Sequence, residues 1–298
     1  MNADRLREFY DRAGFRTART TSAHWFVPGK HIYRSFPAGR PVAPTADEVA
    51  ELCRHSGVYG VEFVNATPIG VPSGLWMVRD PAYDQRSLQR QFRQHLERAF
   101  ADESVQQIGF DELFRLGVTA NLETLGRQRR RDRHFSDPAL WRRLCDAGKQ
   151  TLGAGVFASM RAGELSAYLV YFIVGDTCHG LFSKSCNQAR RAGSNHALYF
   201  IYTKTMIRRE NISTVTTGPQ SIPPIAAIDR FKRHAGYNLE PYHFAVSLRP
   251  RVSALLLSDS AGALLRAGER RFRSSEMLRR ALTLRYEVRE TSRRSPDP

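Results

Sequence analysis

The sequence lacks any apolar run long enough to form a membrane-spanning helix. Its most apolar stretch, residues 165–174, is bracketed by Gly163 and Gly175 and falls short of the roughly 18 residues that such a helix needs. The first residues, MNADRLREFYDR, are charged and lack the apolar centre of a secretory signal. We therefore expect a soluble protein located in the cytoplasm.

Cysteine is scarce, and its spacing excludes the common metal and redox motifs. The four cysteines are Cys53, Cys145, Cys178 and Cys186, and no two of them form a CxxC pair. Cys178, His179 and Cys186 lie near one another in the sequence, but their spacing fits no standard zinc site. We expect reduced, structural thiols and no bound metal.

Acidic residues are few in comparison with basic ones. The 298-residue chain has 29 acidic and 45 basic residues, which gives a formal net charge of +16. Such a field attracts anionic partners, and nucleic acid, a nucleotide-linked sugar, CoA and anionic lipid headgroups all qualify. Because arginine far outnumbers lysine, a GC-rich coding bias is an alternative explanation of the charge. The apolar content of 42% is that of an ordinary globular protein with one or two domains.

The first third of the sequence predicts two helices and several strands. Thr45 followed by Glu48 is a capping box that opens a helix, and Pro28-Gly29 is a turn between two strand-like runs. The expected elements are a helix at 4–13, a hairpin around the Pro28-Gly29 turn, a helix at 46–56, and strands at 58–66 and 75–80.

The middle third is rich in arginine. Residues 84–100 form a basic amphipathic helix whose apolar positions recur every fourth residue, at Leu88, Phe92, Leu96 and Phe100. Its basic side is interpreted as solvated, with phosphate or nucleic-acid binding as the alternative. A strand at 105–110, a short helix at 110–117, an exposed charged loop at 121–135 and a helix from Pro138 to Lys149 follow, the last with Trp141, Leu144 and Cys145 inward.

The clearest structural signal is an antiparallel meander at residues 152–185. Three strand-like runs are joined by short turns that contain Gly163 and Gly175, as hairpins require. The rest of the sequence predicts a polar loop at 186–194, a helix at 195–210, a strand at 213–218, a helix at 225–235, a strand at 239–248, and then a helix with an arginine-rich, mobile tail.

Several segments together resemble the GNAT superfamily of acyltransferases, in its FemAB-like branch. The segment LGAGVFASMRAGELSAYLVYFIVGDTCHGLF is similar to the central hairpin region of that family, and ARRAGSNHALYFIYTKTM is similar to its cofactor loop and following helix. The segments VTTGPQS and IDRFKRHAGYNLEPYHFAV resemble its G…FK…G(Y/F) ending, and LWMVRDPAYDQRSLQRQFRQHLERA resembles its linker helix. The resemblance covers about residues 75–250.

The resemblance implies an α/β (α+β) fold, with a GNAT-type mixed sheet, a central antiparallel meander and flanking helices. Residues 85–250 would be the catalytic domain, and residues 251–298 a C-terminal helix and arginine-rich tail. Residues 1–84 would be an N-terminal lobe, either a degenerate second GNAT-like lobe or a shorter extension.

The resemblance also implies an enzyme that transfers an acyl or aminoacyl group to an amine. The donor would be acyl-CoA, such as acetyl-CoA, or an aminoacyl-tRNA; the acceptor would be an amine on a cell-wall, lipid, saccharide or peptide intermediate. Such chemistry relies on positioning of the reactants and on backbone N–H groups. It needs no catalytic triad, and the motifs GxSxG, Walker A and HExxH are absent.

Donor-binding residues are expected at the loop that precedes the helix at 195–210. Arg190-x-x-Gly193 fits the first positions of the family's pyrophosphate loop, whereas Asn195 departs from its third. Free N–H groups at a helix start bind anions, so Arg190, Arg191, Gly193, Ser194 and Asn195 are candidate phosphate-binding residues. The alternative is a plain helix cap formed by Ser194 or Asn195.

Two further donor-site candidates are Gly218 and Lys232. Gly218 ends a strand where a ligand can approach the backbone, although it also fits a simple turn. Helical spacing places Ile228, Phe231 and Ala235 inward and Asp229, Arg230 and Arg233 toward solvent. By its spacing Lys232 is a solvated lysine, whereas its FK pair resembles the family's lysine in the phosphate region.

The sequence identifies no single general base. His179, His196 and Tyr168 are the candidates for acid–base catalysis, since histidine titrates near neutrality. The alternative is that each is a satisfied core residue. Asp176, in a hairpin turn, is interpreted as structural.

Two other functions fit parts of the sequence. A non-catalytic nucleic-acid-binding protein on a GNAT scaffold is favoured by the basic helix at 84–100, the RQRRRDR run and the basic tail. A membrane-surface role is favoured by an apolar face on the last helix, formed by Met277, Leu278, Ala281, Leu282 and Leu284. The oligomeric state is left open.

Overall fold

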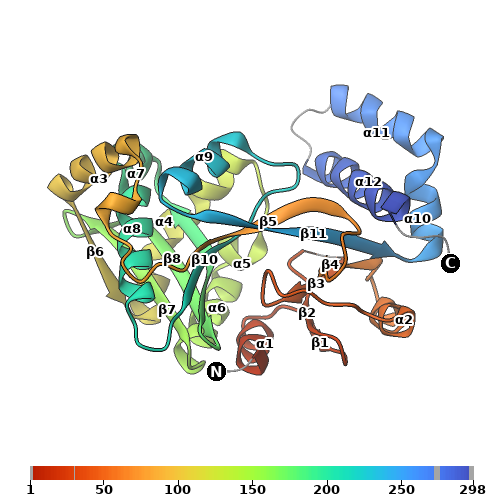
Figure 1. The fold of residues 1–298 in the computed structure, drawn as a ribbon, viewed down its shortest axis with the longest axis horizontal. Helices are drawn as coiled ribbons and strands as arrows, with labels where there is room; N and C mark the ends of the chain where they lie inside the picture. Colours follow the sequence, from red (N-terminus) through yellow and green to blue (C-terminus); the bar gives the residue numbers. More distant parts are fainter. Residues whose placement is uncertain (1–2, 30, 272–275, 295–298) are drawn as a thin grey trace. The chain divides into compact units, whose positions relative to one another are not determined.

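A computed structural model describes residues 3–29, 31–271 and 276–294. The chain packs as two units, each built from separate stretches of sequence (Figure 1). Unit 1 comprises residues 1–14, 75–220 and 224–240, and unit 2 comprises residues 15–74, 221–223 and 241–298. These units group residues that pack together, so the division into segments 1–84, 85–250 and 251–298 stays a prediction.

Unit 1 is built on a mixed sheet with the strand order β5-β10-β9-β8-β7-β6. The predicted meander is confirmed: β7 (Ala154–Arg161), β8 (Glu164–Val174) and β9 (Thr177–Ser185) pair antiparallel. The outer strand β6 (Glu103–Ile108) also pairs antiparallel with β7. On the other side, β10 (Thr214–Pro219) pairs parallel with β9 and antiparallel with β5 (Val71–Val78).

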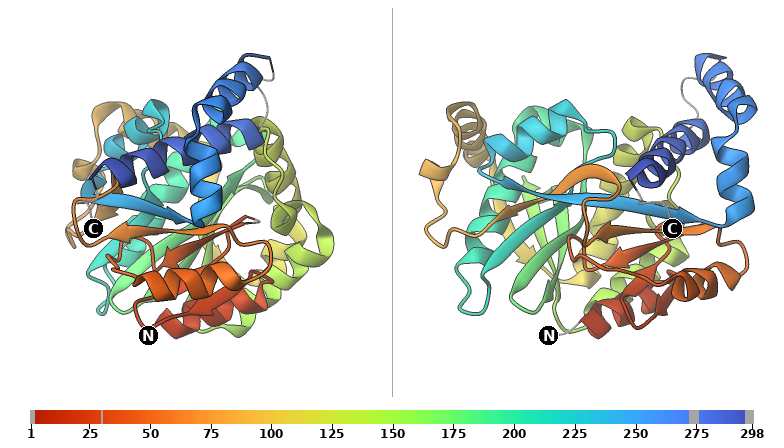
Figure 2. Two further views of the ribbon diagram at one scale, coloured as in Figure 1. Left: turned by 90° about the vertical axis from the view of Figure 1, so that its right-hand side faces the viewer. Right: turned by 45° about the vertical axis from the view of Figure 1, so that its right-hand side comes forward.

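Helices cover both faces of this sheet (Figures 1 and 2). On one face, α3 (Arg90–Asp102) and α8 (Ser194–Ile207) pack on Leu169 and Tyr171 of β8 in one apolar cluster. On the other face lie α1 (Ala3–Arg12), α4 (Phe110–Gln128) and α6 (Pro138–Gln150), which contact the sheet through side chains such as Phe9 against Phe172. Alternate residues of β8 therefore serve two separate cores.

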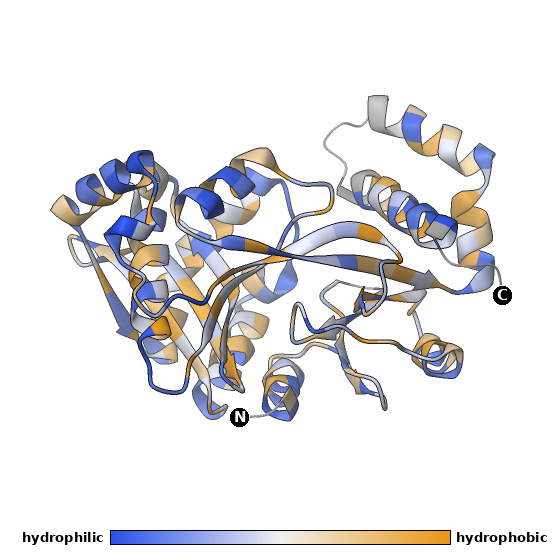
Figure 3. Ribbon diagram, in the orientation of Figure 1, coloured by the Kyte–Doolittle hydropathy of each residue, from blue (hydrophilic) through white to orange (hydrophobic). Residues whose placement is uncertain are grey.

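The basic helix α3 is shorter at its start than its sequence pattern predicts. Asp84 caps a short 3-10 turn, η1 (Gln85–Ser87), and α3 begins only at Arg90. Leu88, Phe92 and Leu96 are buried as expected, whereas Phe100 is exposed. Most of α3 is hydrophilic (Figure 3), and its buried residues Phe92, Leu96 and Ala99 form one face, as in an amphipathic surface helix.

Two segments expected as loops contain helices instead. The short helix predicted at 110–117 continues through Gln128, because Ala120, Thr124 and Leu125 extend its buried stripe. The predicted loop at 121–135 therefore shrinks to a turn before α5 (Arg133–Ser136). The polar segment at 186–194 contains α7 (Asn187–Ala192).

Elsewhere in unit 1 the expected helices are found. Asp137 caps α6 with Pro138 in its first turn, and Trp141, Leu144 and Cys145 are buried. The last helix of unit 1 is α9 (Ala226–His234).

Unit 2 has the strand order β1-β2-β3-β4-β11. The predicted hairpin is confirmed as β2 (His24–Phe26) paired antiparallel with β3 (Ile32–Phe36). The Thr45 capping box is also present and opens α2 (Ala46–Arg54). The remaining strands are β1 (Thr17–Arg19), β4 (Gly60–Asn65) and β11 (Asn238–Leu248).

The C-terminal part of unit 2 contains more helix than its sequence predicts. Its described residues form α10 (Pro250–Leu257), α11 (Asp259–Arg271) and α12 (Glu276–Arg294). The last residues of the predicted tail, 295–298, and the side chain of Met277 lie outside the described part.

A buried group of charges joins α12 to the sheet of unit 2. Glu62 on β4 is 1% exposed and accepts hydrogen bonds from Arg34 and Arg280, each at 2.6 Å. Arg280 also lies 3.6 Å from Glu287, a second buried carboxyl group on α12. The two arginines lower the pKa of Glu62 against the effect of its burial.

Candidate functional site

The parallel strands β9 and β10 separate in the middle of the unit 1 sheet. Their pairing covers three residue pairs and ends where Thr216 is opposite His179, although β9 continues to Ser185. Beyond Thr216 the register of β10 shifts, and Gly218 adopts a left-handed φ of +84°. This bend frees the β10-facing edge of β9 from Gly180 onward, and a glycine is suited to the bend.

Tyr202 holds the two strands together at the point where they separate. Its side chain is fully buried, and its hydroxyl lies 3.3 Å from the carbonyl oxygens of both Cys178 and Thr216. The Cys178 Sγ lies 3.4 Å from the same hydroxyl. Burial raises the pKa of Tyr202 well above its ordinary value. Its place one turn after Leu198 on α8 marks it only as a core residue, so its sequence position does not reveal this role.

Lys232 is buried against the bend of β10. Its side chain is 7% exposed, and its Nζ donates to the carbonyl oxygens of Thr217, at 3.0 Å, and Gly218, at 3.4 Å. Burial lowers the pKa of Lys232 to about 8, against the opposing effect of Asp229. The prediction from helical spacing that Lys232 is solvated is therefore wrong. Gly218 and Lys232, both predicted from the sequence as donor-site residues, lie in contact.

The buried face of α9 also differs from the expected one. Asp229 is 7% exposed, whereas Ile228 is 41% exposed. Gln220 donates through Nε2 to Asp229 Oδ2 at 2.7 Å. Ala235 is buried and Phe231 packs against the core as expected, so the prediction is wrong for Ile228 and Asp229.

The start of α8 is closed by residues of the same chain. Gly193 has a φ of +80°, and a Cβ atom there would lie 2.9 Å from the carbonyl oxygen of His95 on α3. Ser194 is fully buried, and its hydroxyl donates to the carboxylate of Glu103. The other oxygen of Glu103 accepts from Ser159. A buried carboxylate therefore lies beside the first residue of α8.

Three candidate phosphate-binding residues remain near the start of α8: Arg190, Arg191 and Asn195. The Asn195 side chain amide lies 3.5 Å from Ser185 Oγ. Arg190 and Arg191 belong to α7, and their side chains lie outside the described part of the structure. Phosphate binding by these residues stays a prediction.

The three acid–base candidates do not converge on one place. Tyr168 is fully buried beside Trp141 and donates its hydroxyl proton to Asn121 on α4. His179 is the cross-strand partner of Phe172, so its side chain lies on the same face of the sheet as those of Phe172 and Tyr168. His196 lies on α8, which covers the opposite face, with its ring stacked on His95 at 4.7 Å.

Burial controls the ionisation of these three groups. It lowers the pKa of both His179 and His196 to about 4, and it raises the pKa of Tyr168 well above its ordinary value. Each is therefore neutral near pH 7. Their burial and their separate positions are typical of core residues, the alternative interpretation from the sequence.

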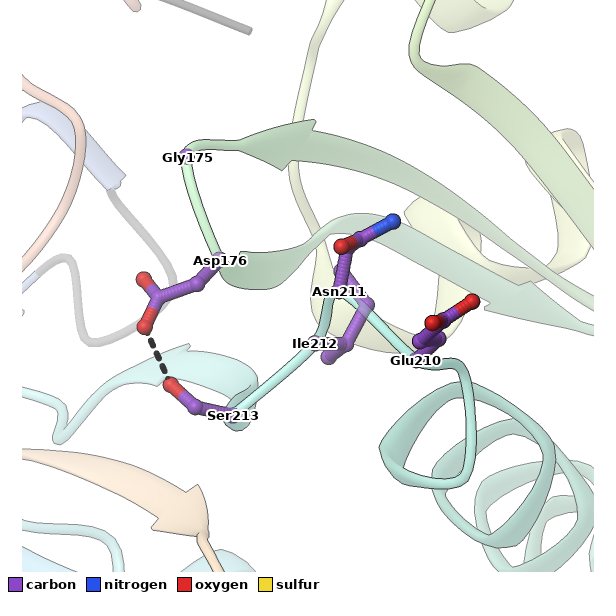
Figure 4. Close-up of a pocket in the computed structure, with 6 residues that line it drawn as sticks. All are labelled: Gly175, Asp176, Glu210, Asn211, Ile212 and Ser213. Atoms are coloured by element: carbon purple, nitrogen blue, oxygen red, sulfur yellow. Dashed lines mark hydrogen bonds between the residues drawn. The ribbon is translucent and has the colours of Figure 1, made fainter.

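A shallow pocket lies at the opposite ends of β9 and β10. It is lined by Gly175, Asp176 and residues 210–213, where Ser213 donates to the Asp176 carboxylate (Figure 4). That hydrogen bond lowers the pKa of Asp176, in keeping with its structural interpretation. Within the described ranges, no three His, Cys, Asp or Glu side chains gather as metal ligands. No described helix is long and apolar enough to span a membrane.

Comparison with known proteins gives structural relatives but no sequence relatives. The sequence matches no family profile and no curated protein. The structure of FemX is similar, with a TM-score of 0.58, 11% identity, and coverage of 85% of this chain and 93% of FemX. The chain has a GNAT-type α/β fold similar to that of FemX.

Two further solved structures have a similar fold. The C-terminal domain of a protein from Agrobacterium fabrum, described as a lysylphosphatidylglycerol synthetase, has a TM-score of 0.55 and 14% identity, with 85% of this chain and 90% of that domain covered. L-PGS from Bacillus licheniformis has a TM-score of 0.51 and 13% identity, with 84% of this chain and 92% of L-PGS covered. Identities this low establish the fold and leave the activity to the site itself.

Proposed function

We propose that the chain is an acyl- or aminoacyltransferase that works where β9 and β10 separate. The observation that carries this proposal is the buried Lys232, whose Nζ meets the carbonyl oxygens of Thr217 and Gly218 at the bend. A buried cation with a lowered pKa, at a break in a sheet, is typical of a functional site. The GNAT-type fold and the FemX and synthetase relatives support the same class of reaction.

In the proposed reaction, an amine attacks the acyl carbon of the donor. The new N–C bond forms, a negative charge develops on the carbonyl oxygen, and the ester or thioester bond to the donor then breaks. Two of the three N–H groups of Lys232 donate to the carbonyl oxygens of Thr217 and Gly218. The third N–H group is left to stabilise that oxyanion. With a pKa of about 8, roughly nine-tenths of the lysine carries its proton at pH 7. Unpaired backbone N–H groups on the free edge of β9 would assist.

We propose aminoacyl-tRNA as the donor, in preference to acyl-CoA. At the start of α8, where a CoA pyrophosphate would bind, the Ser194 hydroxyl contacts the Glu103 carboxylate and Gly193 packs against the His95 carbonyl oxygen. A phosphate placed there would meet a buried like charge. The net charge of +16 also favours a polyanionic donor. The acceptor would be an amine on a peptide, saccharide or lipid intermediate.

The decisive experiment compares Lys232→Met with Lys149→Met, an exposed lysine paired with Asp111. Both proteins are assayed with radiolabelled aminoacyl-tRNA and with acetyl-CoA, against a panel of amino sugars, muropeptides and aminophospholipids. We expect Lys232→Met to lower transfer from aminoacyl-tRNA by about 10²–10³, the typical effect of one oxyanion donor. Lys149→Met should retain the wild-type rate.

Two results would count against the proposal. Equal rates in both variants would remove Lys232 from the site. Transfer from acetyl-CoA but not from tRNA would retain the reaction class and overturn the donor.

A second candidate function, RNA binding without catalysis, is favoured by the turn between α4 and α5. Arg129, Arg130, Arg131 and Arg133 are all exposed there within five consecutive positions. Among these arginines, Arg133 pairs with Asp137. A protein that binds tRNA but transfers nothing from any donor would fit this candidate.

A further inference from the structure

Asp229 is a buried carboxyl group with an unused oxygen. It is 7% exposed, and its Oδ2 accepts from Gln220 at 2.7 Å. Its Oδ1 is enclosed by protein atoms and has no hydrogen-bond partner among the described residues. Because an isolated buried carboxylate is costly, such an oxygen calls for a partner that the chain itself does not supply.

The nearby lysine does not fill this role. Lys232 lies one turn further along α9, yet its Nζ is directed to the Thr217 and Gly218 carbonyl oxygens. Across the described residues, no basic nitrogen lies within 4.0 Å of the Asp229 carboxylate. The two charges influence each other, since Asp229 raises the pKa of Lys232, but they form no ion pair.

A second unsatisfied polar atom belongs to a residue of β10 that contacts Lys232. Thr217, whose carbonyl oxygen binds Lys232, has a buried hydroxyl with no partner among the described residues. One free carboxylate oxygen and one free hydroxyl oxygen are both hydrogen-bond acceptors. Together they suit a small group that carries several N–H donors.

We propose that Asp229, assisted by Thr217, binds the amine of the acceptor substrate as an ammonium ion. A cationic N–H donor binds a carboxylate more strongly than a neutral amide does. An ammonium group would therefore bind at Oδ1, while the Gln220 amide donates to Oδ2. This inference rests on the proposed function and names the chemical class of its acceptor: a primary amine, protonated when free in solution.

The site also accounts for the protons of the proposed reaction. An ammonium gives up two protons in all when it becomes an amide. One is released to solvent as the free amine forms, and the other moves to Asp229 Oδ1 as the N–C bond forms. That second proton passes to the leaving oxygen of the donor ester when its C–O bond breaks. Lys232, on the same helix, keeps its own proton throughout.

The first test measures amine binding without any assay of activity. Wild type, Asp229→Asn and Asp47→Asn are melted in n-propylammonium chloride and in sodium chloride of equal ionic strength. Asp47 is exposed on α2, so its variant matches the change of charge. We expect propylammonium to raise the melting temperature of wild type and Asp47→Asn by a few degrees, and to leave Asp229→Asn unchanged. An equal response in all three proteins, or none in wild type, would overturn the proposal.

The second test measures transfer kinetics. With the acceptor found in the Lys232 experiment, Asp229→Asn should raise the KM for the amine at least tenfold and leave the KM for the donor unchanged. An unchanged amine KM would overturn the role of Asp229 while the proposed function stands. If wild type transfers nothing but its propylammonium response depends on Asp229, the function fails and the ammonium site remains.

Discussion

Gly193 and Gly126 are glycines of unit 1 in opposite surroundings. Gly193 has a left-handed φ of +80°, and a Cβ atom there would lie 2.9 Å from a backbone oxygen of α3. Gly126 lies in α4, and a Cβ atom there would meet nothing within 4 Å. The first position needs glycine for both its backbone conformation and its packing, whereas the second only loses helix stability by having it.

Alanine at these two positions should change stability in opposite directions. We expect Gly193→Ala to lower the free energy of unfolding by about 1–3 kcal/mol, because it combines backbone strain with a contact against His95. Gly126→Ala should raise it by up to about 1 kcal/mol. Urea titrations of both variants measure this, and a neutral Gly193→Ala would show that α3 yields easily.

At the residue scale, the sequence predicted apolar burial well and polar burial poorly. Trp141, Leu144 and Cys145 are inward as expected, since helical spacing follows the apolar pattern. Asp229 and Lys232 are buried against that pattern because the partners of α9 are carbonyl and amide groups of β10 and the loop after it. Such partners come from a separate part of the chain and leave no mark on helical periodicity.

At the scale of elements, α12 of unit 2 contains a carboxyl group that resists ionisation. Burial raises the pKa of Glu287 to about 7, with Glu62 acting in the same direction and Arg280 and Arg34 opposing. The folded state therefore binds this proton more tightly than the unfolded state does. Its contribution to stability is full below about pH 4.5 and is lost as the pH rises through 7.

Glu287→Gln should reveal this contribution. At pH 8 we expect the variant to unfold with a free energy up to about 3 kcal/mol above that of wild type, because it no longer buries a charge. At pH 5 the two proteins should be nearly equal. Urea titrations at both values test the prediction, and a variant less stable than wild type at pH 8 would mean that the Arg280 contact dominates.

The elements themselves could be predicted where the pattern is local. The meander and the Thr45 capping box are confirmed because turn glycines and capping residues act within a few positions. The length of α4 could not be predicted, since its second half is helical through packing of Ala120 and Thr124 under the sheet, beside a dense arginine run. The parting of β9 and β10 depends on pairing between distant segments, and only Gly218 hinted at it.

At the scale of the whole molecule, the net charge of +16 makes binding of a polyanion sensitive to salt. If six to ten phosphates are contacted, tRNA affinity should fall by about 10³–10⁵ between 50 and 200 mM salt. Fluorescence anisotropy with deacylated tRNA measures this dependence of affinity on salt concentration. A flat salt dependence would exclude an electrostatic interface.

The turn between α4 and α5 should account for part of that slope. We expect the triple variant Arg129→Gln, Arg131→Gln and Arg133→Gln to reduce the slope by about 0.9 for each lost phosphate contact. A matched triple variant at Arg5, Arg98 and Arg115, which are also exposed, should change it less. Equal losses would assign the binding to net charge alone.

The division of unit 1 among three stretches of sequence sets the order in which a growing chain can complete it. The first helix waits for β8, since Phe9 packs on Phe172, and β5 waits for β10. Until β10 has been made, β5 lacks its partner strand, and an unpaired apolar strand is a state in which aggregation competes with folding. Lys232 is among the last residues of the unit to be synthesised, so the site of the proposed function is completed only when unit 1 is almost whole.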